Sequence, residues 1–359
     1  MIVLNPGPTK THPELGDWLR RGCESGVPSM HHRSEDFKSL FKDTKEKLFD
    51  LASIPKDFEM FLFGCASEIW EKSCESLVEK SAFIFANGEF GFRWTRCLEA
   101  LKIKHFAAKS DHRFDGNLIE IIPEDCDTIC LVHCETSIGF KIPPDQIRAI
   151  RLTYPEKLII LDAVSTFPIV DLDYSLADVI LFSVQKCFCL PSGMGVALVS
   201  PRAIEKAQKL WDSDRPKSGF ASFAVEHVFA LQNMTPATPN VLNLWLLNRS
   251  VTKYISIGLR QLRQMTLEKA KFIRQSLNPL GFDDLIKNPN QQCETVLTFE
   301  NFSLDCVDIK RKLREKNVYV STGFGDLENS VLRIANFPAH TKEDYLTAFS
   351  ILSEILKAC

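Results

Sequence analysis

The chain alternates between short apolar runs and segments whose apolar residues recur at helical spacing. Six runs have the length of a buried strand: MFLFG near residue 60, SAFIFAN from 81, TICLVH from 128, KLIILD from 157, DVILFS from 178 and GVALVS from 195. Between them, the segments 34–53, 68–79 and 143–153 have the period of amphipathic helices. Strands that alternate with helices predict an α/β fold whose mostly parallel sheet is covered on both faces.

The pattern changes after TPATPN at 235–240. It continues as a long helical segment from about 241 to 277, the strand CETVLTF, a helix at about 304–316, strands near 318–321 and 330–335, and a last helix from about 342. This order predicts a smaller α+β unit, with the boundary inside the long helix near residue 255. We therefore expect a large α/β domain over 16–254 and a small α+β domain formed by 1–15 and 255–359.

Composition and charge narrow the class of protein. The 359 residues are 45% hydrophobic and 25% charged, with a net charge of −3, which gives no reason to expect nucleic acid or a membrane surface as a partner. No apolar run is long enough to span a bilayer. The twelve cysteines form no CxxC pair and no zinc-ligand spacing, so we expect reduced thiols, a cytoplasmic protein and no metal site.

Polar or glycine-rich groups follow five of the predicted strands. In chain order they are GCASEIW, NGEFGFRW, HCETSIG, Asp162 in DAVST, and SVQK with Lys186. Ligands collect beyond the carboxyl ends of the strands in open α/β sheets. The five segments therefore predict an active site at one edge of the sheet.

The chemistry of this edge centres on Lys186, a lone cation between two apolar runs. Desolvation favours the neutral, nucleophilic amine of a buried lysine. An interior carboxylate at Asp162 requires a cationic partner, and the GCAS loop before a helix offers N–H groups to an anion. A Schiff-base lysine, a pyridinium partner and a phosphate loop together indicate pyridoxal phosphate. Taken one at a time, Lys186 could reach solvent along its stem, and Asp162 and Ser67 could be helix N-caps.

The ordered motifs NPGPT, HHRSEDF, NGEFGFRW, HCETSIG, DAVS, SVQK, TPATP and LRIANFP extend over almost the whole chain. In this order they resemble the class V (fold type I) pyridoxal-phosphate aminotransferases, the branch that holds phosphoserine and alanine–glyoxylate aminotransferases. The resemblance implies a mostly parallel seven-stranded sheet in the large domain. It also implies pyridoxal 5'-phosphate as cofactor and a homodimer whose subunits share their active sites.

The resemblance assigns cofactor contacts residue by residue. Lys186 would form the Schiff base and move the proton, and Asp162 would face the pyridine nitrogen. Other cofactor contacts would come from Phe90 stacked on the ring, Thr136 at the phenolic oxygen, Gln185 before the lysine, Ala66 and Ser67 at the phosphate, and Thr235 at the phosphate of the neighbouring subunit.

For the substrate, the resemblance implies that Arg333 holds the α-carboxylate and that His32 and Arg33 hold a phosphate. The leading hypothesis is transamination between O-phosphoserine and 2-oxoglutarate, in serine biosynthesis. The sequence departs from that branch, because GCASEIW lacks an arginine and the segment before Arg333 lacks a second His-Arg pair. An alanine– or serine–glyoxylate aminotransferase stays open as an alternative. A cysteine desulfurase-like lyase is the third hypothesis; it would need a mobile cysteine facing the substrate, whereas Cys306 lies at the start of a helix pattern with no evident loop around it.

Overall fold

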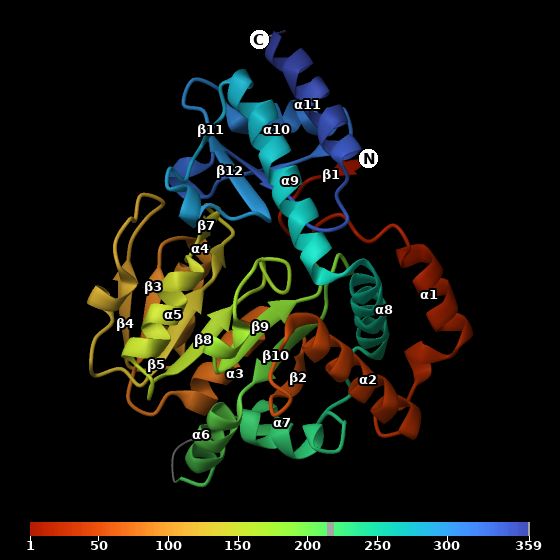
Figure 1. Ribbon diagram of the computed structural model, residues 1–359, viewed down its shortest axis with the longest axis vertical. Coiled ribbons are helices and arrows are strands. Elements are labelled where there is room, and N and C mark those ends of the chain that lie inside the picture. The colour runs from red at the N-terminus through yellow and green to blue at the C-terminus, as the bar shows by residue number, and fades with distance from the viewer. Residues whose placement is uncertain (214–218, 358–359) are drawn as a thin grey trace.

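The computed structural model describes residues 1–213 and 219–357, which form a broad lower lobe and a narrower upper lobe (Figure 1). A seven-stranded sheet lies at the centre of the lower lobe, and a four-stranded sheet lies in the upper one. Helix α9 (Leu259–Leu277) runs from the first lobe into the second.

The large sheet has the strand order β2-β10-β9-β8-β5-β3-β4. Its members are β2 (Glu59–Phe63), β3 (Ala82–Ala86), β4 (His105–Lys109), β5 (Thr128–Val132), β8 (Leu158–Asp162), β9 (Val179–Ser183) and β10 (Gly195–Val199). Strand β10 runs antiparallel to both of its neighbours, β2 and β9, and the other pairs of this sheet are parallel. The predicted α/β fold with a mostly parallel seven-stranded sheet is confirmed.

Each strand of this sheet sends alternate side chains to opposite faces, as the period of two requires. On β3, Phe83 and Phe85 join one apolar core while Ile84 joins the other. The first core is covered by α2 (Glu35–Ala52), α5 (Pro144–Thr153) and α8 (Val241–Ile257). The second is covered by α3 (Ala66–Leu77), α4 (Glu89–Ala100), α6 (Pro201–Trp211) and α7 (Phe223–Ala230). The sheet is thus buried on both sides.

All six apolar runs form the expected strands, but the pattern did not predict β4. This edge strand, HFAAK, is half-buried and short, so it lacks the continuous apolar run that marks the central strands. The single long helix expected over 241–277 is wrong. The chain breaks it into α8 and α9 at Gly258, whose φ of 90° suits glycine and not a helix interior.

The upper lobe has a sheet of order β11-β12-β15-β14. Its strands are β11 (Asp283–Asp284), β12 (Val296–Glu300), β14 (Ser321–Thr322) and β15 (Val331–Ala335), and its helices are α9, α10 (Cys306–Glu315) and α11 (Lys342–Lys357). A short hairpin of β6 (Cys134–Glu135) and β7 (Phe140–Lys141) lies at the carboxyl end of β5.

The N-terminal residues belong to the upper lobe. Strand β1 (Ile2–Val3) pairs in parallel with β13 (Val318–Tyr319), and the chain then descends to α1 (Leu15–Glu24) beside α8. The N-terminal segment therefore passes the junction of the two lobes.

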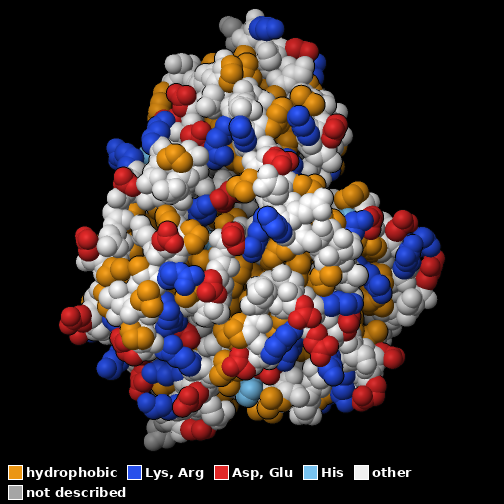
Figure 2. Space-filling view, viewed as in Figure 1, with side chains coloured by type: hydrophobic (Ala, Val, Ile, Leu, Met, Phe, Trp, Pro, Cys, Tyr) orange, Lys and Arg blue, Asp and Glu red, His pale blue; other side chains and the backbone are white. Residues whose placement is uncertain are grey.

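On the face shown in Figure 2, basic and acidic side chains are interspersed rather than separated by sign. Within the described residues, no helix combines the length and the apolar character needed to cross a membrane.

Candidate active site

A cavity of about 360 Å³ opens at the carboxyl ends of the parallel strands, between the two lobes. Parallel pairing gathers the ends of β5, β8 and β9 at this edge, because Val132 pairs with Asp162 and Asp162 with Leu181. Eight of the eleven predicted site residues line the cavity: Ala66, Ser67, Phe90, Thr136, Asp162, Gln185, Lys186 and Arg333.

Lys186 lies three residues after β9 and is only 7% exposed. Its Nζ donates to the hydroxyls of Thr136 (3.1 Å) and Ser165 (2.9 Å), which lie 2.5 Å from each other. Burial lowers the pKa of Lys186, while the nearby Asp162 carboxylate acts in the opposite direction. The amine is therefore held by neutral acceptors in a place that disfavours its charge.

Asp162 ends β8 and is 4% exposed. Its Oδ1 accepts from the backbone N–H of Val164 (2.9 Å), and its Oδ2 accepts from the indole N–H of Trp70 (2.8 Å). Trp70 is itself stacked on Trp94, with ring centroids 5.5 Å apart. Burial raises the pKa of Asp162 to about 6 despite these two donors, so the carboxylate is poised to gain from a cation.

The start of α3 forms another wall of the cavity. Cys65 at its N-cap makes no side-chain capping bond, while the N–H of Ala66 donates to the hydroxyl of Ser183 (3.2 Å). Gly195 lets this turn approach β10, since a Cβ there would lie 2.5 Å from the carbonyl carbon of Cys65. The first turn of α3, with Ala66 and Ser67, thus lies at the cavity wall, where the N–H groups of a helix start can bind an anion.

Phe90 lies in the first turn of α4, with its ring centroid 5.2 Å from the Nζ of Lys186. The buried carboxylate of Glu135 fixes this turn, accepting from the N–H groups of Phe90 (3.3 Å) and Gly91 (2.9 Å). A Cβ at Gly88 would lie 2.5 Å from the hydroxyl oxygen of Ser137. Glycine is therefore required where α4 packs on the β6–β7 hairpin.

Arg333, on β15, brings the upper lobe into the site. Its Nε donates to the carbonyl of Thr322 (2.7 Å) and its Nη1 to the carbonyl of Thr136 (3.1 Å). Its guanidinium carbon lies 4.5 Å from the ring centroid of Phe324. Burial lowers the pKa of Arg333 to about 10, while the charge of Glu135 acts in the opposite direction, and no carboxylate within the described residues lies within ion-pair distance of the guanidinium. The buried cation therefore needs an anion from outside the chain.

The N-terminal segment closes the cavity beside Lys186. Pro6, Gly7 and Pro8 line it, and a Cβ at Gly7 would lie 2.9 Å from the Cε of Lys186. The N–H of Thr9 donates to the carbonyl of Gln185 (3.2 Å). This wall is therefore in direct contact with the segment that carries the lysine.

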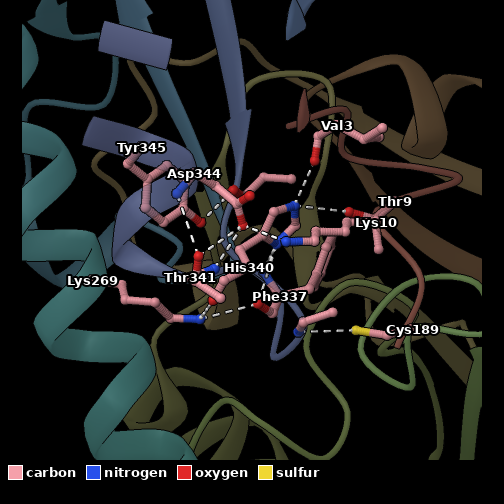
Figure 3. A network of polar contacts seen from close by, with 12 residues as sticks. Val3, Thr9, Lys10, Cys189, Lys269, Phe337, His340, Thr341, Asp344 and Tyr345 are labelled. Atoms are coloured by element: carbon pink, nitrogen blue, oxygen red, sulfur yellow. Dashed lines mark hydrogen bonds and ion pairs between the residues drawn. The ribbon is translucent and has the colours of Figure 1, made fainter. Parts of the chain in front are cut away.

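His340 ties this wall to the upper lobe, as Figure 3 shows. Its Nδ1 lies 3.0 Å from the backbone nitrogen and 3.1 Å from the carbonyl oxygen of Phe337, and its Nε2 lies 2.9 Å from the carbonyl oxygen of Val3 and 3.3 Å from Thr9 Oγ1. Lys10 reaches Asp344 at 2.6 Å in the same network. Burial lowers the pKa of His340 to about 4, so its ring is neutral at physiological pH.

The other three predicted residues lie outside this cavity. Thr235 lines a separate hollow of about 280 Å³ with Thr238 and Glu226. His32 Nδ1 lies 3.4 Å from the hydroxyl of Thr238, and the guanidinium of Arg33 lies 5.9 Å from the centroid of the Phe229 ring. The three residues thus lie in one neighbourhood outside the cavity of Lys186, with Thr235 buried, His32 half-buried and Arg33 exposed.

Sequence reasoning missed several residues that shape the cavity, among them Trp70, Ser165, Arg93 and the Pro6–Pro8 segment. Trp70 and Ser165 follow predicted residues by three positions each, which was the available signal. Cys306 packs in the core of the upper lobe and does not line the cavity. Within the described residues, no group of three or more His, Cys, Asp or Glu side chains is placed to hold a metal ion, and every cysteine is free.

The cavity's donor set fits pyridoxal phosphate. Asp162 is a buried carboxylate whose two hydrogen-bond partners are neutral donors, so its negative charge can pair with a protonated ring nitrogen. The start of α3 offers backbone N–H groups to a phosphate, and Lys186 carries a desolvated amine for a carbonyl group.

Comparison with known proteins gives the same picture. The family model for aminotransferase class-V matches residues 5–326. A phosphoserine aminotransferase of Corynebacterium glutamicum (strain R) is 27% identical over 360 residues, which cover 94% of this chain and 90% of the relative. An uncharacterized aminotransferase of Helicobacter pylori (strain J99) is 24% identical, with coverages of 93% and 88%.

Solved structures also match this chain along its length. A phosphoserine aminotransferase from Cytophaga hutchinsonii is similar with a TM-score of 0.92 and 29% identity, covering 98% of this chain and 97% of the other. An alanine–glyoxylate aminotransferase from Nostoc sp. shares the fold with a TM-score of 0.88 and 19% identity, with coverages of 99% and 95%.

Proposed function

Because this chain belongs to the class V aminotransferases and is a pyridoxal-phosphate-dependent transaminase, we propose that it transfers the amino group of O-phosphoserine to 2-oxoglutarate, forming 3-phosphohydroxypyruvate and glutamate. The observation that carries this proposal is the buried Lys186 amine, which shares one cavity with the unpaired Arg333 guanidinium. The phosphoserine aminotransferases among its relatives support this choice of donor. We place the reaction in cytoplasmic serine biosynthesis, where thiols stay reduced.

Different residues of the cavity hold different parts of the cofactor. When bound, pyridoxal phosphate supplies a ring that withdraws electrons from the substrate α-carbon. Asp162 would hold the proton on the ring nitrogen, and Phe90 would lie against the ring. The N–H groups around Ala66 and Ser67 receive the phosphate. Gln185 and Thr136 position the cofactor's polar edge.

Two basic side chains act on the substrate. Arg333 receives the α-carboxylate in the bidentate geometry that a guanidinium allows. Lys186 accepts the proton from the α-carbon, because burial lowers the pKa of its amine and increases the share of the neutral base.

We propose that Thr235, His32 and Arg33 act in the cavity of a second subunit. Beside them, α7 and the residue after it expose Val228 (52%) and Leu231 (64%), an apolar surface suited to a subunit contact. The chain would then be a homodimer with shared sites, in which His32 and Arg33 bind the phosphate of the partner's substrate.

The first experiment measures transamination by the purified protein with pyridoxal phosphate and 2-oxoglutarate. O-phosphoserine, alanine and serine serve in turn as donor. We expect the largest kcat/KM with O-phosphoserine, and no turnover by a Lys186→Ala variant. Preference for alanine or serine would contradict the phosphoserine assignment, and full activity of Lys186→Ala would contradict the role of the lysine.

A mixing experiment tests the shared site. Lys186→Ala and Arg33→Ala are each expected to be impaired with O-phosphoserine. Chains unfolded and refolded together would form heterodimers with one intact site, so random pairing restores about a quarter of the wild-type rate. If each chain's Arg33 served its own cavity, mixing would restore nothing.

A second candidate is transamination between alanine or serine and glyoxylate. The position of His32 and Arg33 favours it, because the cavity of a single chain has no His-Arg pair for a phosphate among the residues that the structure describes. The donor comparison above separates the two reactions.

A further inference from the structure

Arg93 is a second guanidinium at the cavity to which the motifs assign no role. It lies on α4, one turn after Phe90, and lines the cavity. Its Nε donates to Glu89 at 2.6 Å, and its two terminal nitrogens have no hydrogen-bond partner within the described residues. The part of Arg93 that recognises anions is therefore available.

Glu89 does not neutralise this region. The same carboxylate oxygen also accepts from Arg96 at 3.2 Å, so one acid faces two arginines. Around the cavity wall, the guanidinium groups of Arg93 and Arg333 are cations, and Asp162 is the only acidic residue among the described residues that line it. The cavity thus has room for more negative charge than one carboxylate supplies.

Arg93 lies on the same side of the cavity as Arg333, because both contact the ring of Phe324. Their guanidinium carbons lie 6.0 and 4.5 Å from its centroid, so they cannot be farther apart than these distances combined. The terminal carbons of a five-carbon diacid lie roughly 5 Å apart, given C–C bonds of about 1.5 Å. With one hydrogen bond of about 2.8 Å at each end, such a molecule is long enough to reach both guanidinium groups.

We propose that Arg93 binds the distal acidic group of the substrate, so that the cavity selects molecules with an acidic group at both ends. This inference rests on the proposed function, since it assumes that Arg333 holds the α-carboxylate. The distal group is the γ-carboxylate of 2-oxoglutarate or glutamate, or the phosphate of O-phosphoserine. Phe324, 38% exposed, is the side chain that both guanidinium groups contact.

Binding of two unreactive acids to the full-length protein loaded with pyridoxal phosphate tests this, by titration calorimetry. Glutarate carries both acidic groups and butyrate only one. We expect Arg93→Gln to weaken glutarate about tenfold and to leave butyrate within twofold. Arg96→Gln is the matched control, because Arg96 shares Glu89, is 63% exposed and does not line the cavity; it should change neither affinity.

Unchanged glutarate affinity in Arg93→Gln would overturn the proposal, as would equal weakening of both acids, which would indicate a general disturbance of the Phe90 and Phe324 packing. Steady-state kinetics identify the distal group, because Arg93→Gln should raise the KM for O-phosphoserine, for the acceptor 2-oxoglutarate or for both, and should leave the KM for pyruvate unchanged. If glutarate binding depends on Arg93 but the wild-type protein does not use O-phosphoserine, the inference stands and the phosphoserine assignment fails. If O-phosphoserine is used but the Arg93→Gln change leaves glutarate binding unchanged, the phosphoserine assignment stands and the inference fails.

Discussion

The buried carboxylate of Asp162 should make the cofactor-free protein less stable as the pH rises. The pKa of this group is raised from 3.8 to about 6, because burial disfavours the ionised form. The native state then binds more protons than the unfolded state between these values, so stability present below pH 3.8 is lost as the pH rises through about 6. At about 1.36 kcal/mol for each pKa unit, the loss reaches about 3 kcal/mol at neutral pH.

Replacing Asp162 with Asn removes this titration. About 2 kcal/mol of the loss falls between pH 4.5 and 8. We therefore expect the difference in unfolding free energy, Asp162→Asn minus wild type, to increase by about 2 kcal/mol from pH 4.5 to pH 8. The change with pH is the informative quantity, because the lost hydrogen bond from Trp70 shifts both ends equally. The assay is urea unfolding of the cofactor-free proteins at several pH values, followed by circular dichroism.

Two further outcomes test the reasoning. Adding pyridoxal phosphate should remove most of the wild-type pH dependence, because a protonated ring nitrogen would stabilise the charged carboxylate. Trp70→Phe keeps the stacking on Trp94 but removes a donor to the carboxylate, so the loss of stability should extend to higher pH. Parallel stability curves for wild type and Asp162→Asn would refute the assignment of a raised pKa to this residue.

Other changes test the walls of the site. Burial lowers the pKa of His340 from 6.5 to about 4, so its contribution to stability is present above pH 6.5 and is lost as the pH falls through 4. In urea unfolding at acidic pH, His340→Gln should not show this loss of about 3 kcal/mol. In Gly195→Ala the added Cβ would collide with the carbonyl group of Cys65. We expect this variant to bind pyridoxal phosphate about tenfold more weakly, as measured by absorption titration. Gly16→Ala, where the added Cβ meets open space, should leave the affinity unchanged. Gly258→Ala should cost about 1–3 kcal/mol in unfolding free energy through its φ of 90° alone, and a neutral result would contradict the strain.

Local pattern was sufficient for the central strands of the large sheet. Their apolar runs are continuous because both faces are buried, so six of the seven were visible, and the polar groups after them converged as parallel pairing requires. The edge strand β4 was missed because its half-buried residues carry no such run. The break at Gly258 was missed because glycine in a helical pattern does not reveal its φ.

The sequence predicted those residues of the site that come directly after a strand. Trp70 and Ser165 touch predicted residues through tertiary packing, which helical or strand period does not encode. The contribution of Pro6–Pro8 depends on the pairing of β1 with β13, more than three hundred residues away. The motifs assigned no role to Arg93, and only its place beside Phe324 distinguishes it.

The N-terminal wall beside Lys186 and the residues that hold it in place are synthesised at very different times. Its N-terminal segment is made early, yet the partners that fix it, β13 and His340, leave the ribosome late. The 331 positions between Thr9 and His340 take roughly 20–70 s to translate at 5–20 residues per second. During that time the large sheet can form while its cavity is open on one side. Cofactor capture should therefore follow release of the chain rather than accompany its growth.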